Sequence, residues 1–577
     1  MSALLSVRDL HVGFGRDPQA NEVVKGVSFE IEAGQTLAIV GESGSGKSVT
    51  ALSINRLVDF GGGRITAGSI LLQCNDGTLL DVTAADAASL THVRGRDIGM
   101  IFQEPMTSLN PVHTIGAQIE EAFRLNRGLS GRAATNAARQ ALDRVRIADA
   151  AQRLTYYPHQ LSGGMRQRAM IAMTIASNPR LLIADEPTTA LDVTVQAQIM
   201  ALLAELREET GMSMIFITHD IGLVAGIADR IMVMQDGSAV EQGPLDAVLD
   251  DPKHDYTRHL LQAVPHFNGG RAVRRDGTRS NAAAPVVIVD DLVVRFPIAK
   301  RWFSPAAGAV HAVDGVNFDL VAGETLGIVG ESGSGKSTTA RAILGLVQTT
   351  RGRIDKARGR SPRPVQMVFQ DPFASLNPRL NVASLLAEPA IAARQRVDAG
   401  LRQRMQALLT RVGLPDDALT RYPHQFSGGQ RQRLCIARAL MLNPEVVVLD
   451  EAVSALDVSV QARVLDLLID LQHEFSLAYL FISHDMAVVE RIAHRIAVMY
   501  AGQIVEIGDA AAVLSDPQHS YTRRLIAAVP AIEHRNQRFT VDATQVPSLV
   551  RARGYEPPPA RWREAGIDHR VRIEETP

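Results

Sequence analysis

The amino-acid sequence predicts an α/β fold in which two similar domains follow one another, each built on a mostly parallel sheet. Two observations support this prediction. The string YPHQLSGGMRQR at 157–168 returns as YPHQFSGGQRQR at 422–433, so the chain contains an internal repeat. Within each copy, short apolar runs typical of strands alternate with segments of helical spacing, the order expected of parallel βα units.

The elements of each copy follow one order along the chain. Apolar Val27, Phe29 and Ile31 alternate with polar residues, and 316–320 repeat this pattern, which indicates half-buried strands. Apolar residues within 401–412 instead follow helical spacing. We therefore expect strands, a glycine-rich loop and its helix, a helical insert, and then alternating short strands and helices.

The repeat also sets the domain boundaries. We expect domains at 1–265 and 285–530, joined by a linker at 266–284 whose Gly, Arg, Asn and Ala show no apolar periodicity. The remaining 531–577 mixes arginines with acids, and we expect a weakly ordered tail. The first copy is longer, and most of its additional residues fall in a stretch that contains 61–86.

Composition excludes several classes of protein. Lys and Arg number 60 against 62 Asp and Glu, so the chain lacks the basic excess of a nucleic-acid-binding protein. Two cysteines, Cys74 and Cys435, are too few for a disulfide framework, an iron–sulfur cluster or a four-sulfur zinc site, which favours a reducing compartment. An apolar run of about 18 residues and a secretion signal are both missing, so we expect a cytoplasmic chain that does not span a membrane.

Two glycine-rich loops predict nucleotide binding. GESGSGKS at 41–48 and again at 330–337 satisfies G-x-x-x-x-G-K-[ST], after an apolar strand and before a helix-forming stretch. Such loops turn their backbone N–H groups toward phosphate, while the lysine reaches the β- and γ-phosphates and the serine binds magnesium. The predicted ligands are Gly41, Ser43, Gly44, Gly46, Lys47 and Ser48, and Gly330, Ser332, Gly333, Gly335, Lys336 and Ser337.

Each copy has an acid pair at the end of a buried-strand pattern, in LLIADE at 181–186 and VVVLDE at 446–451. Asp185 and Asp450 are predicted to hold magnesium, and Glu186 and Glu451 to orient and polarise the attacking water. An acid pair alone often marks only a solvated strand end. Its combination with a phosphate loop favours catalysis.

A glutamine and a histidine also follow strand patterns in each copy. Gln103 and Gln370 can reach the metal or water at the γ-phosphate. His219 and His484 each lie 34 residues after the aspartate of the acid pair, and this repeated spacing favours a catalytic role over a structural one.

Two phenylalanines are candidates for stacking on adenine. Phe14 and Phe296 correspond through DLHVGF and DLVVRF. Core packing is an open alternative, because 27 residues separate Phe14 from its phosphate loop and 34 separate Phe296 from the other.

A further string, SGG, precedes a helical stretch in each copy and supplies a second N-terminus that can bind an anion. The two strings are Ser162-Gly163-Gly164 and Ser427-Gly428-Gly429. Together with the other motifs and with ALD at 190–192 and 455–457, this set resembles the nucleotide-binding domain of ATP-binding cassette (ABC) proteins over 4–265 and 286–530. The resemblance implies two tandem ABC-type P-loop NTPase domains, each with a mostly parallel core, an antiparallel β subdomain and a helical subdomain.

The same resemblance implies an ATPase that uses ATP and Mg²⁺. In that family two domains dock head to tail around ATP, so Lys47 would pair with Ser427, and Lys336 with Ser162, in an intramolecular dimer. Every motif is intact in both copies, which implies two sites competent for hydrolysis.

FQEPMTSLNP, FQDPFASLNP and the paired DP-x-H-x-YTR endings look like those of importer ATPases for dipeptides, oligopeptides, nickel or glutathione. The likeness implies a protein on the cytoplasmic face of the inner membrane. Its partners would be two permease subunits, docked near Gln103 and Gln370, and an extracytoplasmic substrate-binding protein, with no nucleic acid. Peptide import is the main prediction, and nickel or glutathione import is the alternative.

A soluble tandem ATPase acting on ribosomes or DNA is a weaker alternative, because the linker is short and zinc cysteines are missing. Two departures from the importer pattern stand out. The tail lacks the cysteine cluster of many relatives, and Ala452 replaces the proline found at Pro187, for which we expect little catalytic consequence.

Overall fold

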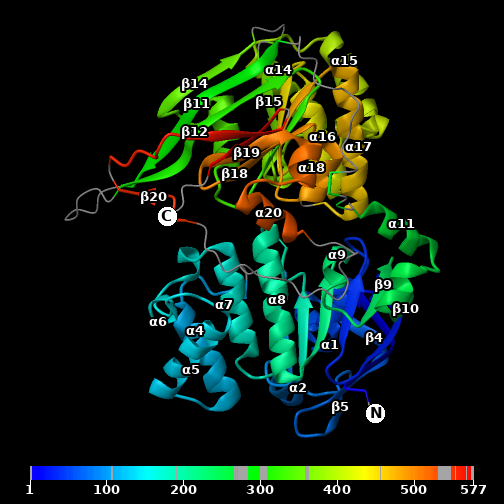
Figure 1. Cartoon of the computed structure of the whole chain (residues 1–577). Helices are drawn as coiled ribbons and strands as arrows, with labels where there is room; N and C mark the ends of the chain where they lie inside the picture. The colour runs from blue at the N-terminus through cyan, green and yellow to red at the C-terminus, as the bar shows by residue number, and fades with distance from the viewer. Residues whose placement is uncertain are drawn as a thin grey trace. The chain divides into compact units, whose positions relative to one another are not determined.

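The chain folds into two compact units that repeat one architecture (Figure 1). One unit comprises residues 1–191 and 195–264, and the other 265–529 and 542–577. The computed structural model describes residues 3–104, 108–189, 191–264, 267, 269–270, 284–298, 308–357, 361, 363–454, 456–529, 547–552, 554–566 and 568–573.

Within the described residues, the first unit is built on a six-stranded sheet of order β10-β9-β3-β8-β7-β6, in which only β10 runs antiparallel to its neighbour. Every residue of β3, β7 and β8 is buried, as expected for strands that are covered on both faces. The strands are β3 (Thr36–Val40), β6 (Ile98–Ile101), β7 (Leu181–Asp185), β8 (Ser213–Thr218), β9 (Arg230–Gln235) and β10 (Ser238–Pro244).

A second sheet of the first unit is antiparallel, with the order β2-β1-β4-β5. The alternation at Val27, Phe29 and Ile31 falls in β2 and buries all three side chains, as predicted. β5 lies within the stretch 61–86 that lengthens the first copy. The strands are β1 (Leu5–Phe14), β2 (Glu22–Ile31), β4 (Gly63–Gln73) and β5 (Leu79–Asp81).

Helices complete the first unit, and α4 to α7 gather beside its core sheet as a helical subdomain (Figure 1). Local signals set their ends: the Thr114 hydroxyl caps α4, which stops at Gly128 with φ of 66°. The helices are α1 (Lys47–Ile54), α2 (Ala87–Val93), α4 (Ile115–Arg127), α5 (Gly131–Arg144), α6 (Ala150–Arg153), α7 (Gly163–Ile175), α8 (Val193–Thr210), α9 (Ile221–Val224), α10 (Leu245–Asp250) and α11 (Asp255–Ala263).

The second unit repeats the core sheet and lengthens it to eight strands, in the order β15-β16-β17-β13-β18-β19-β22-β21. Pairing is parallel from β15 to β18 and antiparallel beyond. The strands are β13 (Thr325–Val329), β15 (Val365–Val368), β16 (Val446–Asp450), β17 (Ala478–Ile482), β18 (Arg495–Tyr500), β19 (Gln503–Asp509), β21 (Trp562–Gly566) and β22 (His569–Arg572).

The antiparallel sheet of the second unit has the order β14-β11-β12-β20. Its strands are β11 (Pro285–Pro297), β12 (Ala309–Val321), β14 (Arg351–Lys356) and β20 (Val550–Arg551). The predicted helical spacing within 401–412 falls in α15. The helices are α12 (Lys336–Leu344), α13 (Pro372–Ser375), α14 (Val382–Ala392), α15 (Ala399–Arg411), α16 (Gly428–Leu440), α17 (Val458–Phe475), α18 (Met486–Ile492), α19 (Ala510–Ser515) and α20 (Ser520–Ala527).

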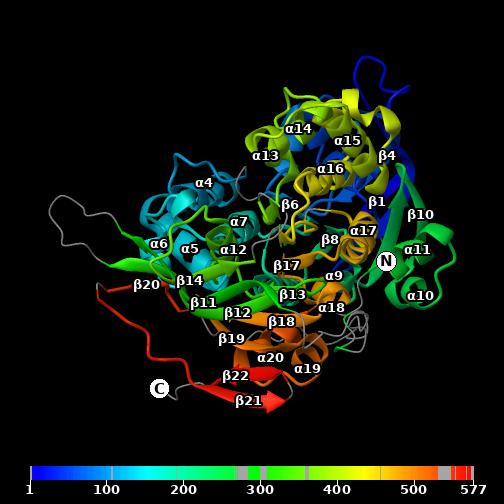
Figure 2. The same ribbon diagram turned by 90° about the horizontal axis from the view of Figure 1, so that it is seen from above.

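The structure corrects the prediction for the C-terminal 531–577. We expected a weakly ordered tail, but β20 pairs with β12, and β22 pairs with β19 and β21 (Figure 2). The polar composition led to the wrong prediction because an added edge strand can be polar. Such a strand draws much of its stability from backbone pairing with strands that are distant in sequence. Residues 531–546 lie outside the described part of the chain.

Of the predicted linker at 266–284, the structure describes only 267, 269, 270 and 284, so this expectation lies largely outside the described residues. Among the described residues, we find no helix with the length and apolar character needed to cross a bilayer.

Candidate nucleotide site

The first phosphate loop connects β3 to α1, and two of its glycines have conformations that a side chain would disturb. Gly41 has φ of 151°, and a Cβ there would lie 2.2 Å from the carbonyl oxygen of Met234. Gly46 caps α1 with φ of 96°. Lys47 Nζ donates to the carbonyl oxygens of Gly41 and Glu42 at 2.8 and 2.7 Å, which holds its ammonium over the loop.

The second phosphate loop, between β13 and α12, has the same geometry. Gly330 has φ of 150°, and its added Cβ would lie 2.2 Å from the Met499 carbonyl oxygen. Lys336 Nζ donates to the carbonyl oxygens of Gly330 and Glu331 at 2.7 and 2.8 Å. Burial lowers the pKa of Lys336, because a charged ammonium loses hydration there.

A serine and an aspartate meet beside each loop. Ser48 Oγ donates to Asp185 Oδ1 at 3.0 Å, and Ser337 Oγ donates to Asp450 Oδ1 at 2.9 Å. Burial raises the pKa of Asp185 to about 6 and also raises the pKa of Asp450. Each site therefore has a hydroxyl and a poorly hydrated carboxylate that a cation would stabilise.

Glu186 follows β7 in the left-handed region, with φ of 45°, and its N–H donates to the Ile217 carbonyl oxygen at 2.9 Å. This backbone turn directs the carboxylate toward residues that follow neighbouring strands. Gln103 Nε2 donates to Glu186 Oε2 at 3.0 Å, and His219 Nδ1 lies 3.2 Å from Oε1. Burial alone would raise the pKa of Glu186, but hydrogen bonds from His219 and Thr189 lower it to about 2.

Glu451 has the same arrangement in the second unit, with φ of 48°. Gln370 Nε2 donates to its Oε2 at 2.6 Å, and His484 Nδ1 lies 3.5 Å from its Oε1. Burial opposes ionisation of both side chains, yet their contact lowers the pKa of Glu451 and raises that of His484. Both glutamates are thus carboxylates at neutral pH, each held by an amide and an imidazole.

The SGG strings begin helices, as the sequence predicted. Ser162 and Ser427 are exposed N-caps of α7 and α16, and their hydroxyls accept from the N–H of Met165 and Gln430 at 3.3 and 3.4 Å. A Cβ at Gly428 would meet nothing within 4 Å. The start of α16 therefore has open space beside Gly428, while the Ser427 hydroxyl occupies the N–H of Gln430.

The third residue of each SGG string packs tightly within its own unit. A Cβ at Gly164 would lie 2.6 Å from Val195 Cγ1, and one at Gly429 would lie 2.3 Å from Val460 Cγ1. These glycines set how closely α7 approaches α8 and how closely α16 approaches α17.

The two phenylalanine candidates differ in environment. Phe14 is half-buried and packs against the core of the first unit, with ring atoms 2.9 Å from a Cβ built at Gly63. Phe296, near the end of β11, is 42% exposed. The exposed ring of Phe296 is available for stacking, whereas Phe14 contributes to packing where it lies.

Sequence reasoning missed Thr189, whose Oγ1 donates to Glu186 Oε2 at 2.8 Å. The corresponding Ser454 donates instead to the backbone oxygen of Glu451 at 2.9 Å. The signal was present in DEPTTALD and DEAVSALD, where threonine and serine stand three residues after the glutamate. Ala190 and Ala455 of the ALD strings lie outside the described residues.

Two sequence families match the chain. The family described as ABC transporter matches residues 24–189 and 313–454. The family described as oligopeptide/dipeptide transporter, C-terminal region, matches residues 240–286 and 505–554.

Curated relatives match nearly the whole chain. It is 49% identical to the glutathione import ATP-binding protein GsiA of Salmonella paratyphi A, over 98% of this chain and 96% of the relative. The protein of the same name from Escherichia coli K12 is 49% identical over 96% of this chain and 94% of its own length. Among solved structures, the ATP-binding cassette MJ0796, a dimer bound to ADP and Pi, is 29% identical and covers 42% of this chain and 98% of its own, with a TM-score of 0.37.

Proposed function

Since this chain belongs to the ABC transporter family of ATP-binding proteins, we propose that it hydrolyses ATP to drive an importer of small peptides, with glutathione as cargo. One observation carries the proposal: similarity to glutathione import ATP-binding proteins extends over nearly the full chain. The oligopeptide/dipeptide transporter region, which matches once in each copy, agrees with it. Glutathione was the alternative cargo of the sequence analysis, and as a tripeptide it is chemically close to the peptides of the main prediction.

The chain's own residues would divide the chemistry as follows. Lys47 and Lys336 bind the β- and γ-phosphates, and Glu186 and Glu451, which are ionised, orient and polarise a water molecule. His219 and His484 fix the orientation of each carboxylate and stabilise its charge. Gln103 and Gln370 hold the second carboxylate oxygen, so that each glutamate has one defined position.

Magnesium fits the donors beside each loop. Ser48 with Asp185, and Ser337 with Asp450, offer hydroxyl and carboxylate oxygens about 3 Å apart, the hard ligands that Mg²⁺ prefers. A bound Mg²⁺ would neutralise phosphate charge in the transition state. Binding would also stabilise the ionised form of Asp185, whose pKa is raised by burial to about 6.

We propose further that each ATP site takes its second half from the other copy, Lys47 with Ser427 and Lys336 with Ser162. The support is local: α7 and α16 begin with exposed serine caps followed by glycine, a start that binds anions through N–H groups and the helix dipole. ATP would then favour closure because the opposite helix contacts it only in the closed state.

Paired substitutions test this exchange. Lys47→Ala with Ser427→Phe would damage one composite site and leave the other, so we expect the ATPase rate to equal that of Lys47→Ala alone. Lys47→Ala with Ser162→Phe would damage both sites and abolish turnover. The reverse ranking in a steady-state ATPase assay would show that each copy completes its own site.

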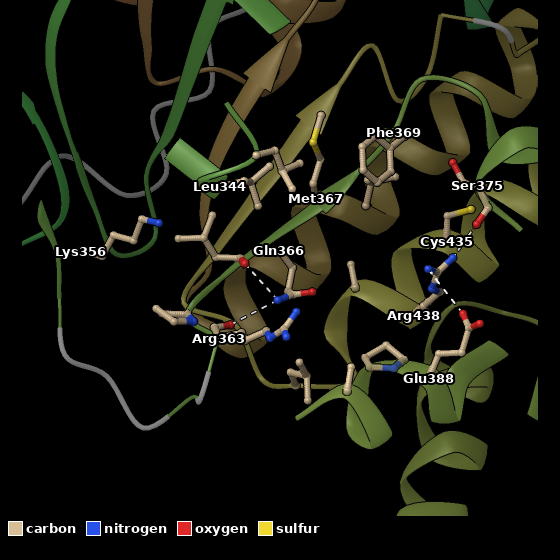
Figure 3. A pocket seen from close by; sticks show the side chains of 18 residues that line it. Leu344, Lys356, Arg363, Gln366, Met367, Phe369, Ser375, Glu388, Cys435 and Arg438 are labelled. Atoms are coloured by element: carbon tan, nitrogen blue, oxygen red, sulfur yellow. Dashed lines mark hydrogen bonds and ion pairs between the residues drawn. The ribbon is translucent and has the colours of Figure 1, made fainter. Parts of the chain in front are cut away.

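A cavity of about 580 Å³ in the second unit offers a docking place for a permease (Figure 3). Phe369, the residue before Gln370, lines it together with side chains of β15, α14 and α16. Arg438 donates to the Ser375 carbonyl oxygen at 2.6 Å and lies 3.6 Å from Glu388. The lining is mainly apolar, with the Arg438–Glu388 pair and two further cations, Lys356 and Arg363, and this combination suits an amphipathic helix from a cytoplasmic loop.

We expect Ala392→Arg, which places a charge in the lining of this cavity, to abolish stimulation of ATPase by the permeases and to leave basal ATPase intact. Ala393→Arg, at the next residue and outside the lining, is the matched control. Permease stimulation that survives in Ala392→Arg would place the docking surface elsewhere.

Transport in proteoliposomes tests the complete proposal. The chain, at the cytoplasmic face, would be reconstituted with two permeases and a substrate-binding protein, and uptake of labelled glutathione, a dipeptide and Ni²⁺ compared. We expect ATP-dependent glutathione uptake that excess unlabelled glutathione suppresses. Uptake of Ni²⁺ alone, or ATPase stimulated by ribosomes and not by permeases, would contradict it.

A further inference from the structure

A tyrosine hydroxyl anchors the start of each phosphate loop. Tyr256 of α11 accepts from the backbone N–H of Glu42 at 3.1 Å, and Tyr521 of α20 accepts from the N–H of Glu331 at 2.9 Å. Both tyrosines belong to the repeated DP-x-H-x-YTR string. The segment characteristic of the oligopeptide/dipeptide transporter family is therefore bonded directly to the loop that binds phosphate.

Tyr521 is held firmly in the second unit. Its side chain is buried, its ring lies 4.3 Å from that of Tyr500 between centroids, and the Arg524 guanidinium lies 5.3 Å from the ring centre. Burial, with the charge of Glu331 nearby, raises the pKa of Tyr521, so its hydroxyl stays protonated. A buried ring fixed by packing gives the Glu331 N–H one acceptor position.

A carboxylate fixes the start of the helix that carries this tyrosine. Glu506 of β19 accepts from the N–H of Gln518 at 2.8 Å and of His519 at 3.0 Å. His519 Nδ1 in turn accepts from the N–H of Tyr521 at 3.1 Å and caps α20. The position of Tyr521 therefore depends on the orientation of Glu506.

The first copy has the same scaffold up to this point. Glu241 of β10 accepts from the N–H of Lys253 at 2.7 Å and of His254 at 3.0 Å, and His254 Nδ1 accepts from the N–H of Tyr256 at 3.2 Å. Glu241 is half-buried, and β10 is the edge strand of its sheet among the described residues.

The C-terminal hairpin β21–β22 makes the second copy different. His569 Nε2 lies 2.8 Å from Glu506 Oε1, and both side chains are buried, Glu506 with no exposed surface. Arg563 Nη2 donates to Gln518 Oε1 at 3.1 Å. Gly508 permits this approach, because a Cβ there would lie 3.0 Å from His569 Cα.

We propose that the hairpin β21–β22 is a positioning element for the second phosphate loop alone, acting from His569 through Glu506 and Tyr521 to Glu331. The proposal rests on the assignment of 330–337 as a nucleotide site. Glu506 and Glu241 are each bonded on both oxygens, but Glu506 is fully buried and receives a third contact, from His569. This extra contact restricts the orientation of Glu506, and with it the start of α20 and its tyrosine. The two ATP sites are then unequal in affinity although their motifs are alike.

Binding of Mg-ADP by isothermal titration calorimetry tests the proposal in the full chain, since ADP reports the loop without requiring turnover. Lys47→Ala leaves the second loop as the tighter site, and Lys336→Ala leaves the first. With Lys47→Ala, we expect Tyr521→Phe to weaken ADP binding about two- to tenfold, the effect of one lost hydrogen bond. His569→Ala should weaken it at least about twofold, and His569→Gln, whose amide nitrogen can donate from the same place, should restore it.

The matched control is the Lys336→Ala chain. There Tyr256→Phe should weaken ADP binding, whereas Tyr521→Phe and His569→Ala should not change it. Loss of folded protein would lower the binding stoichiometry and leave the dissociation constant unchanged, so it is distinguishable from a positioning effect.

Arg563→Ala gives an independent measurement, because its side chain is exposed and its removal leaves no buried charge. It should weaken ADP binding with Lys47→Ala and not with Lys336→Ala. Unchanged affinity for Tyr521→Phe, His569→Ala and Arg563→Ala in the Lys47→Ala chain, or equal losses in both chains, would overturn the proposal. If ADP binding at the second loop changes as expected but the chain does not support glutathione transport, that result counts against the proposed cargo and not against the role of the hairpin.

Discussion

Glu186 and Glu451 follow their strands with positive φ, a conformation that costs a non-glycine residue free energy. In each unit the strained turn brings the carboxylate within hydrogen-bonding reach of a glutamine and near a histidine from two other strand ends. These contacts keep each carboxylate ionised despite burial, which suits the water-orienting role that we propose for it.

At this scale, the double variant Glu186→Gln with Glu451→Gln tests the assignment of the two glutamates. We expect ATPase to fall by at least about 100-fold, because an amide cannot accept a proton from water. Binding of ATP should persist, since neither side chain holds phosphate, and the closed form should accumulate. Near-normal turnover in the double variant would refute the assignment, and each single variant is a control for the remaining site.

Thr189 gives a residue-scale prediction that distinguishes the copies. In a chain with Glu451→Gln, Thr189→Val should lower the ATPase rate about three- to tenfold, because Glu186 loses one hydrogen bond to its charged oxygen. The control is Ser454→Ala in a chain with Glu186→Gln, where the hydroxyl only meets a backbone oxygen. Equal effects of Thr189→Val and Ser454→Ala would show that the carboxylate contact is unimportant.

At the scale of elements, the helices α7 and α16 combine a capped N-terminus with close packing. Ser427 and Gln430 form a reciprocal capping box at α16, whereas Met165 stands at the equivalent place in α7. Gly429 allows α16 to lie against Val460 of α17. The cap and the packing together fix where the N–H groups of the SGG string point.

Substitutions of the neighbouring Gly428 and Gly429 separate the packing of α16 from the access of phosphate to its N-terminus. Gly429→Ala should destabilise the second unit by about 1–3 kcal/mol, because its Cβ overlaps Val460 and α16 must shift. Gly428→Ala has open space and should leave the melting temperature unchanged, yet lower ATPase if a phosphate must approach this N-terminus. Scanning calorimetry and an ATPase assay on both variants measure the two effects, and equal melting temperatures would contradict the packing argument.

At the scale of the whole molecule, the two units differ most in their C-terminal additions. Arg295, beside Phe296 on β11, donates to both carboxylate oxygens of Glu556 at 2.7 Å, and His311 N–H donates to the Leu549 carbonyl oxygen at 2.9 Å. With β22 on β19, the described C-terminal residues are bonded to both sheets of the second unit. They are part of that unit's fold.

Removal of residues 547–577 should therefore lower the melting transition of the second unit by several degrees, and we expect about 4–8 °C for a loss near 2 kcal/mol. The physical reason is the exposed edges of β12 and β19 and the loss of the His569 partner of Glu506. Differential scanning calorimetry measures this shift, with a chain that ends at residue 573 as control. Identical transitions in the two chains would contradict a structural role for β20–β22.

Much of the candidate site could be predicted because its parts are contiguous in sequence. A phosphate loop is a strand, a turn with glycines at positive φ and a helix start, so GESGSGKS contains both the residues and their geometry. The acid pairs and the SGG strings likewise follow directly from a buried strand and a capped helix. Repetition of these strings in the same order in both copies separated them from chance.

The rest required contacts between distant segments. The bonds of Glu186 to Gln103 and His219 join residues 83 and 33 positions away, and Tyr521 meets Glu331 across 190 positions. The periodicity of apolar residues does not predict such long-range contacts, because they depend on the order of the strands in the parallel sheet. For the same reason, half-buried Phe14 and exposed Phe296 could not be told apart from their similar strings.

The sequence by itself determined that this protein has two α/β units, each with the full set of motifs that we predict to bind and hydrolyse ATP, because each motif is a local arrangement of backbone and side chains. Only the tertiary structure decided which side chains hold each glutamate, that a tyrosine anchors each phosphate loop, and that the polar C-terminus completes the second unit. Those features depend on the order and edge pairing of the strands. The contacts that stabilise this arrangement join groups that are far apart along the chain and meet only when it folds.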